Sequence, residues 1–207
     1  MNIDVFHDTV CPWCRIGLRN LELALAEWDG EPVAVRLHPF QLDPSLPPEG
    51  IALADYFGAR GVADPEPMFD RVRAMGRQAG LEFRFAPDDR MPNTLASHQL
   101  VGMAGERARD ALAAIHRAYF EAGRDIGDPA VLAELGAEAG LDPATVAAAL
   151  ADPAARAEVA AAAEEGRALG ITGVPFFVID GRLAVSGAQP PERLLDAMRQ
   201  AAPAATA

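Results

Sequence analysis

The sequence contains no lysine, because all 18 of its basic residues are arginines. This excludes a Walker-type lysine, a Schiff-base lysine and a lysine general base. The arginines are outnumbered by 30 aspartates and glutamates, which gives a formal net charge of −12 at pH 7. Sequence-independent binding to a phosphate backbone needs a positive surface, so we expect no nucleic-acid partner.

Long apolar runs are also missing, and none approaches the ~18 residues that a membrane span needs. The stretch Met1–Asp8 has neither the positive region nor the long apolar region of a signal peptide. We therefore predict no membrane partner and a cytoplasmic location, where thiols are normally reduced. The 207 residues, half of them hydrophobic, suit one domain or one domain that carries a large insertion.

Both ends of the sequence have the pattern of sheet-forming units. Asn2–Asp8 and Val33–Phe40 are short and β-prone, and the apolar spacing from Trp13 to Trp28 predicts a buried helix between them. Near the other end, two β-prone segments flank the hairpin signal Asp180-Gly181. A last helix follows, opened by Pro190-Pro191.

The middle of the sequence has a helical character. Helix starts of the Asp-Pro type occur at Asp64, Asp128, Asp142 and Asp152, and glycines typical of helix ends occur at Gly80, Gly140 and Gly170. Leu95–Phe120 places apolar residues on one helical face. We predict an α/β protein with a thioredoxin fold (β-α-β, then β-β-α) and a large all-helical insertion. Residues 1–48 and 171–207 form the thioredoxin-like domain, and residues 49–170 form the insertion.

The two cysteines form the motif Cys11-Pro12-Trp13-Cys14 at the start of the first predicted helix. Two sulfurs three residues apart at a helix start can reach bonding distance with little backbone movement. The free N–H groups and the dipole of the helix favour the thiolate of Cys11, which we expect to face solvent. Such a pair after a strand, in a β-α-β unit, is typical of redox chemistry. We predict Cys11 as the nucleophile and Cys14 as the resolving thiol.

Histidines near this motif have two interpretations. His7, four residues before Cys11, could supply positive charge to the thiolate, or it could be an ordinary strand-end or surface histidine. A zinc site needs four ligands, and the remaining donors (His7, His38, His98 and His116) are not spaced as a second half-site, so we predict no metal. His98 could point toward the active-site groove or act as a structural histidine.

Pro175, directly before a β-prone run, belongs at a strand start or at a sheet edge. The trans form is the commoner geometry for an X-Pro bond. A cis bond would turn the chain sharply and could expose the peptide groups of Val174 to an extended partner.

These motifs together resemble the DsbA-like thioredoxin-fold family, and its cytoplasmic FrnE-type dithiol–disulfide isomerases in particular. The resemblance covers essentially the whole chain and rests on four features: Cys11-Pro-Trp-Cys14 with Ile16-Gly17, the helical insertion, Thr172-Gly-Val-Pro-Phe-Phe-Val178, and Val185-Ser-Gly-Ala-Gln189. Unlike periplasmic members, the chain has no signal peptide and no histidine between its cysteines. A strongly oxidising potential is therefore not implied.

The resemblance implies a cis Pro175 facing the dithiol, with Val174 offering backbone hydrogen bonds to substrate. Pro12 and Trp13 would belong to the same substrate-binding face. Gln189 would lie near this face, or would only end a strand and cap a helix.

The leading functional prediction is a thiol–disulfide oxidoreductase that acts on a protein or a small molecule containing a disulfide or a dithiol. Its redox group would be the Cys11–Cys14 disulfide, with no other cofactor and with glutathione or another thiol as co-substrate. A monomer and a homodimer both fit. One alternative is a glutathione-dependent isomerase or transferase of the hydroxychromene-carboxylate isomerase or kappa type, which typically has serine at the position of Cys11. The other is a non-enzymatic metal-binding or redox-sensing module.

Overall fold

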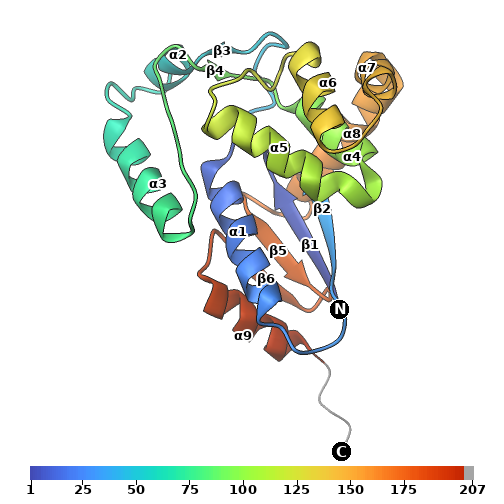
Figure 1. Ribbon diagram of the computed structural model, residues 1–207. Coiled ribbons are helices and arrows are strands. Elements are labelled where there is room, and N and C mark those ends of the chain that lie inside the picture. The colour runs from blue at the N-terminus through green and yellow to red at the C-terminus, as the bar shows by residue number, and fades with distance from the viewer. Residues whose placement is uncertain (203–207) are drawn as a thin grey trace, which may run out of the picture.

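The computed structural model describes residues 1–202, and its main sheet has four strands in the order β2-β1-β5-β6 (Figure 1). Strands β1 (Asn2–His7) and β2 (Ala34–Pro39) are parallel. Strands β5 (Phe176–Ile179) and β6 (Leu183–Ser186) complete the sheet in antiparallel pairing. This is the predicted thioredoxin arrangement. Residues 203–207, the end of the predicted thioredoxin-like domain, lie outside the described residues.

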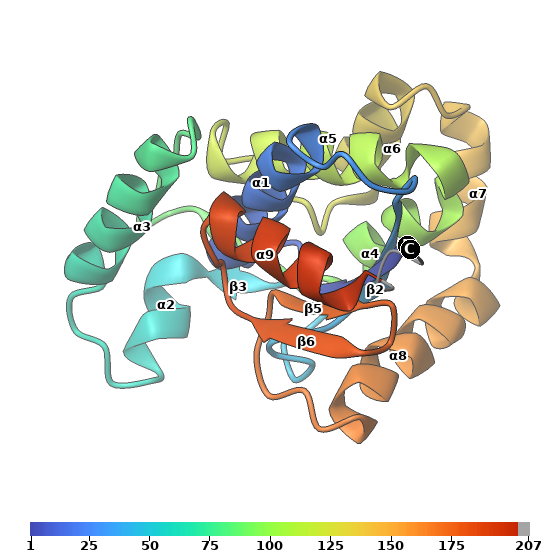
Figure 2. The same ribbon diagram turned by 90° about the horizontal axis from the view of Figure 1, so that it is seen from below.

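Helices cover both faces of this sheet. Helix α1 (Pro12–Ala26) and helix α9 (Pro191–Ala201) lie side by side on one face (Figure 2). Successive side chains of a strand point to opposite faces, so Ile3 and Val5 pack toward these two helices. Phe6 points the other way and packs with Phe40 beneath the end of helix α8 (Pro153–Ala168).

The hairpin between β5 and β6 turns where the sequence predicted it. Asp180 and Gly181 have φ angles of 49° and 65°. A two-residue turn with positive φ at both positions matches the right-handed twist of the strands that it joins. Asp180 also accepts a hydrogen bond from the backbone N–H of Asn2, at 2.6 Å, and so ties the turn to the start of β1.

Between β2 and β5 the chain forms a helical region. Besides α8, its helices are α2 (Leu53–Gly58), α3 (Glu66–Gln78), α4 (Leu95–Met103), α5 (Ala108–Phe120), α6 (Pro129–Glu138) and α7 (Pro143–Ala151), with a short 3₁₀ turn at Gly105–Arg107. The sequence did not predict the two-stranded antiparallel sheet of β3 (Ile51–Ala52) and β4 (Arg90–Met91). The division of the chain at residues 49 and 170 into two domains stays a prediction.

Three of the four predicted Asp-Pro helix starts are N-caps. The carboxylates of Asp128, Asp142 and Asp152 accept the first free N–H groups of α6, α7 and α8. At Asp64 the helix begins two residues later, at Glu66, whose N–H the Asp64 carboxylate accepts. None of the helices formed by residues 1–202 is long and apolar enough to cross a membrane.

The start of α1 packs into the hydrophobic core of the helical region, whereas the buried side chains of the sheet form two further clusters. A cluster of buried side chains runs from Val10 and Ile16 at the start of α1 into α4, α5 and α6. Arg15 also links α1 to the helical region. Its guanidinium donates to the carbonyl of Glu82 at 2.9 Å and pairs with Glu121 at the end of α5. The start of α1 is therefore held between the sheet and the helical region.

Candidate active site

The dithiol lies at the N-terminus of α1, directly after β1. Cys11 is the N-cap with an extended backbone, and Pro12 occupies the first helical position, where its missing N–H costs nothing. The N–H of Cys14 donates to the carbonyl of Cys11 at 3.0 Å, which brings the second cysteine back toward the first. The two cysteines are free thiols 3.3 Å apart.

Pro175 faces this pair. The Val174–Pro175 peptide bond is cis, as the family resemblance implies. The Sγ atom of Cys11 lies 3.6 Å from the carbonyl oxygen of Val174. The turn after β6 is joined to the same place, because the N–H of Gly187 donates to the carbonyl of Pro175 at 2.8 Å. The start of α1 and the turn before β5, which are far apart in the sequence, are thus in contact at the Cys11 sulfur.

Gly17 allows α1 to approach Pro175 closely. A Cβ atom at this position would lie 2.7 Å from Cγ of Pro175, closer than side chains pack. The glycine is therefore a positioning element of the site, one turn after the motif. The resemblance used Gly17 as part of its pattern, but the sequence did not show that it contacts Pro175.

The expectation that Cys11 faces solvent is wrong, because the residue is only 3% exposed. The reason is the contact with the Val174–Pro175 turn, which covers the N-terminus of α1. Cys14 is completely buried behind it.

The surroundings of Cys14 favour the protonated form of its thiol. Burial raises the pKa of the Cys14 thiol well above its ordinary value, and its hydrogen bond to Cys11 and the charge of Cys11 raise it further. Cys14 therefore keeps its proton at neutral pH.

A buried carboxylate behind the dithiol was missed by the sequence analysis. Asp8 follows β1 and is 1% exposed. Its carboxylate accepts the N–H of Leu42 at 2.7 Å and lies 3.3 Å from Nε2 of His98. His98 is buried and lies against Asp8, which fits the structural alternative considered above. Asp8 could have been noticed only as a polar residue at the end of a strand, since its partner is distant in the sequence.

His7 does not supply the positive charge considered for it. The side chain is buried, and both ring nitrogens lack a hydrogen-bond partner among the described residues. Burial lowers its pKa well below the ordinary value, and the nearby histidines His98 and His116 lower it further. The ring is therefore neutral at pH 7, with its centroid 5.1 Å from that of His98.

The other predicted substrate-binding residues surround the pair unevenly. Pro12, Trp13 and Val174 are partly buried, and the Arg71 guanidinium lies 5.9 Å from the Trp13 ring. Gln189 is tied to its own turn: its amide donates to the carbonyl of Ser186 at 2.8 Å. This bond to the last residue of β6 fits the strand-end alternative, but Gln189 does not cap α9, which has no side-chain cap.

Residues 1–202 contain no cluster of three or more histidine, cysteine, aspartate or glutamate side chains that could hold a metal ion.

Comparison with known proteins identifies the family. A model of the DSBA-like thioredoxin domain matches residues 2–199. The chain belongs to the DsbA-like thioredoxin-domain family. The crystal structure of the probable DsbA oxidoreductase SCO1869 from Streptomyces coelicolor is similar to this DsbA-like chain with a TM-score of 0.88 and 37% identity, over 97% of this chain and 89% of that one.

Two further relatives extend the comparison. The cytosolic disulfide reductase DsbM from Pseudomonas aeruginosa has a TM-score of 0.64 and 25% identity, over 97% of this chain and 95% of its own; it has also been solved with GSH. YwbO from Bacillus subtilis (strain 168) is 29% identical over 197 residues, which are 91% of this chain and 90% of YwbO. The similarity to these relatives therefore covers more than nine-tenths of the DsbA-like chain, including its helical region.

Proposed function

We propose that this DsbA-like protein catalyses thiol–disulfide exchange through Cys11 and Cys14. The observation that carries the proposal is the position of Cys11 Sγ, at a helix N-terminus, beside its protonated partner Cys14 and 3.6 Å from the Val174 carbonyl. A nucleophile, a resolving thiol and a backbone edge for substrate are thus close together. These are the parts that disulfide exchange needs.

The reaction proceeds in two exchanges. The thiolate of Cys11 attacks one sulfur of a substrate disulfide, forms a mixed disulfide and releases the other substrate sulfur as a thiolate. Cys14 then gives its proton to the released substrate thiolate and attacks the Cys11 sulfur. This step forms the Cys11–Cys14 disulfide and releases the second substrate thiolate. The substrate gains two electrons and the enzyme loses two, which a thiol such as glutathione restores by the same exchange in reverse.

Within this activity we propose a FrnE-type dithiol–disulfide oxidoreductase of the cytoplasm that can also isomerise disulfides. The neighbour DsbM, a cytosolic disulfide reductase, supports the compartment and the use of a small thiol. The Cys-Pro-Trp-Cys motif supports isomerisation, because Cys11 can form a mixed disulfide that a substrate thiol resolves instead of Cys14.

The test compares single-cysteine variants of the full chain. Cys11→Ser should abolish reduction of a model disulfide, whereas Cys14→Ser should accumulate a mixed disulfide at Cys11, detected by mass spectrometry. Titration of the wild-type pair against a defined thiol buffer gives its potential and the direction of electron flow. If no disulfide forms between Cys11 and Cys14 at any buffer ratio, the dithiol mechanism is wrong.

The same variants separate the alternatives. A glutathione-dependent isomerase or transferase would keep full turnover after Cys14→Ser, because its chemistry does not need a resolving thiol. A metal-binding or redox-sensing module would show stoichiometric zinc in the purified protein and protection of both thiols from alkylation. Full dithiol turnover without either behaviour supports the oxidoreductase.

A further inference from the structure

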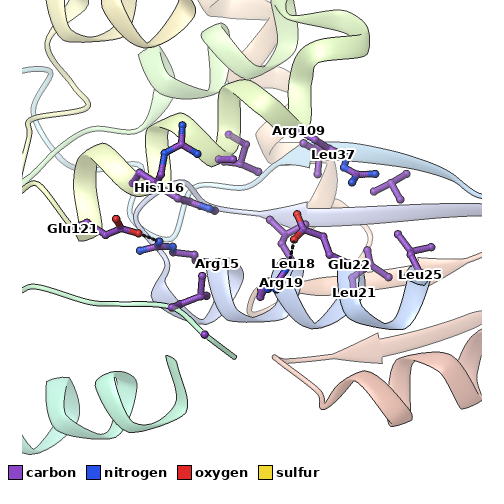
Figure 3. Close-up of a pocket in the computed structure, with 16 residues that line it drawn as sticks. Arg15, Leu18, Arg19, Leu21, Glu22, Leu25, Leu37, Arg109, His116 and Glu121 are labelled. Atoms are coloured by element: carbon purple, nitrogen blue, oxygen red, sulfur yellow. Dashed lines mark hydrogen bonds and ion pairs between the residues drawn. The ribbon is translucent and has the colours of Figure 1, made fainter. Parts of the chain in front are cut away.

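A cavity lies on the other side of α1 from Pro175. It has a volume of about 320 Å³, within the range of small-molecule sites, and lies between α1, β2 and α5 (Figure 3). Arg15, Leu18 and Glu22 face it from α1 at the three- and four-residue spacing of one helical face. Gly17, which touches Pro175, lies on a different face of the same helix. The cavity is therefore separate from the dithiol face.

The charge of this cavity is opposite to that of the whole protein. Four arginines and two glutamates line it, in a chain whose net charge is −12. Both glutamates already have partners, since Glu121 pairs with Arg15 and Glu22 pairs with Arg19. Neither glutamate of the cavity pairs with the two arginines that α5 contributes, so these arginines could bind an anion.

These two cations are Arg109 and Arg117. Among residues 1–202, no carboxylate forms an ion pair with Arg109, and Arg117 has only a long contact of 3.9 Å with Glu138. Figure 3 shows Arg109 above the cavity, on the helix that also carries His116. An arginine guanidinium fits the planar geometry of a carboxylate, so an acidic group would bind at this rim.

The inside of the cavity is apolar and contains one buried polar ring. Its apolar side chains come from α1, β2, α5 and the segment after α3, and they include Leu18, Leu25, Leu37 and Leu112. The His116 ring lines the same cavity, is 4% exposed, and has no hydrogen-bond partner for Nε2. Unpartnered buried polar atoms are uncommon in proteins, and a ligand would provide a partner here.

We propose that this cavity binds a small organic anion, with its apolar body among the leucines and its carboxylate at the α5 rim, where Arg109 or Arg117 pairs with it. This function goes beyond disulfide exchange and does not require it. Arg15, the residue that follows Cys14, lines the cavity. A bound ligand would therefore contact the start of the helix that carries the dithiol.

The test uses decanoate, below its micelle-forming concentration, in calorimetric titration of the full chain at low ionic strength. Wild-type protein should bind one decanoate saturably, and added salt should weaken binding because the site is partly open to solvent. The variant with both Arg109→Gln and Arg117→Gln should bind about tenfold more weakly, since the partly exposed charge contact at this rim is lost. Its exchange activity without decanoate should match wild type, which keeps this test separate from that of the dithiol.

Three controls can overturn the proposal. The double variant Arg193→Gln and Arg199→Gln on α9 removes the same charge outside the cavity and should bind like wild type. Decyltrimethylammonium, which has the same chain length but a positive head, should not compete. Equal weakening in both arginine variants, equal binding of the cation, or no saturable decanoate binding would refute the site. A dimer that dissociates on Arg109→Gln and Arg117→Gln would instead assign this face to a second copy of the chain.

Discussion

The contact between Gly17 and Pro175 leads to a quantitative prediction about a conservative substitution. Replacing a glycine inside a helix by alanine usually stabilises a protein by up to about 1 kcal/mol. In Gly17→Ala the new methyl group would lie 2.7 Å from Cγ of Pro175 and 3.3 Å from Cζ of Phe177. Overpacking of this kind costs about 1–3 kcal/mol. We therefore expect Gly17→Ala to lower the free energy of unfolding by about 1 kcal/mol.

The structure offers a matched control in α4. Gly102 is also helical, and an added Cβ would meet no heavy atom within 4 Å. Gly102→Ala should leave stability unchanged or raise it by up to about 1 kcal/mol, because only the helix propensity changes. Urea unfolding of the reduced proteins at pH 7 measures the difference in the free energy of unfolding. One m-value, the slope of that free energy against urea concentration, is used for both variants.

Activity provides the second measurement for this pair. The methyl group of Gly17→Ala must push away Pro175, and with it the Val174 carbonyl that lies 3.6 Å from Cys11 Sγ. The rate of disulfide exchange should therefore fall although both cysteines are intact, whereas Gly102→Ala should keep the wild-type rate. If both variants are stabilised equally and exchange at the wild-type rate, α1 does not pack on Pro175 as described.

Two further predictions concern pH. The pKa of Cys14 is raised by burial, then by its hydrogen bond to Cys11 and the charge of Cys11, so the reduced protein keeps its full stability below the pKa of an unfolded cysteine. Stability should fall above pH ~8.5. Between about pH 7.5 and 9.5, the free energy of unfolding should change less steeply with pH in Cys14→Ser than in the wild type. Burial, followed by the charges of Arg15 and His98, lowers the pKa of His116 to about 3. An unfolded histidine takes up its proton near pH ~6.5, so stability should fall as the pH is lowered from there, by up to about 1.4 kcal/mol per pH unit. His116→Gln should remove this part of the slope between about pH 6.5 and 5, and an unchanged slope would contradict the assignment.

The features that the sequence predicted are those that depend on neighbouring residues. The dithiol pair follows from spacing at a helix start, and the β-hairpin follows from Asp180 and Gly181, which adopt the positive φ angles that the turn requires. Asp128 and Asp142 cap helices because the cap and its N–H donors are two or three residues apart. Each of these interactions is complete within a few positions of the chain.

Helix boundaries inside the helical region were harder to predict from the sequence. The apolar spacing of Leu95–Phe120 continues across a break at Gly105, where φ is 56° and the chain passes from α4 to α5. Both helices bury their apolar faces in the same core, so the pattern shows no interruption. Strands β3 and β4 are only two residues long, too short for a period of two to appear.

The burial of the site was missed because distant segments cause it. Cys11 is covered by the Val174–Pro175 turn, and the Asp8 carboxylate meets His98, a residue of the helical region. A polar residue at a strand end has no local signal for such a partner. The motif therefore located the two cysteines of the proposed site, while their surroundings required the tertiary structure.

The start of α1 is fixed from two sides, and this has a consequence for the chemistry. Gly17 seats the helix on Pro175, and Arg15 holds it to the helical region through the Glu82 carbonyl, with its guanidinium 5.0 Å from the centroid of the Phe83 ring. Exchange requires Cys11 and Cys14 to stay close while a third sulfur approaches in line. The geometry of the dithiol therefore depends also on Arg15 and Gly17, two residues outside the Cys-Pro-Trp-Cys motif that anchor the helix after it.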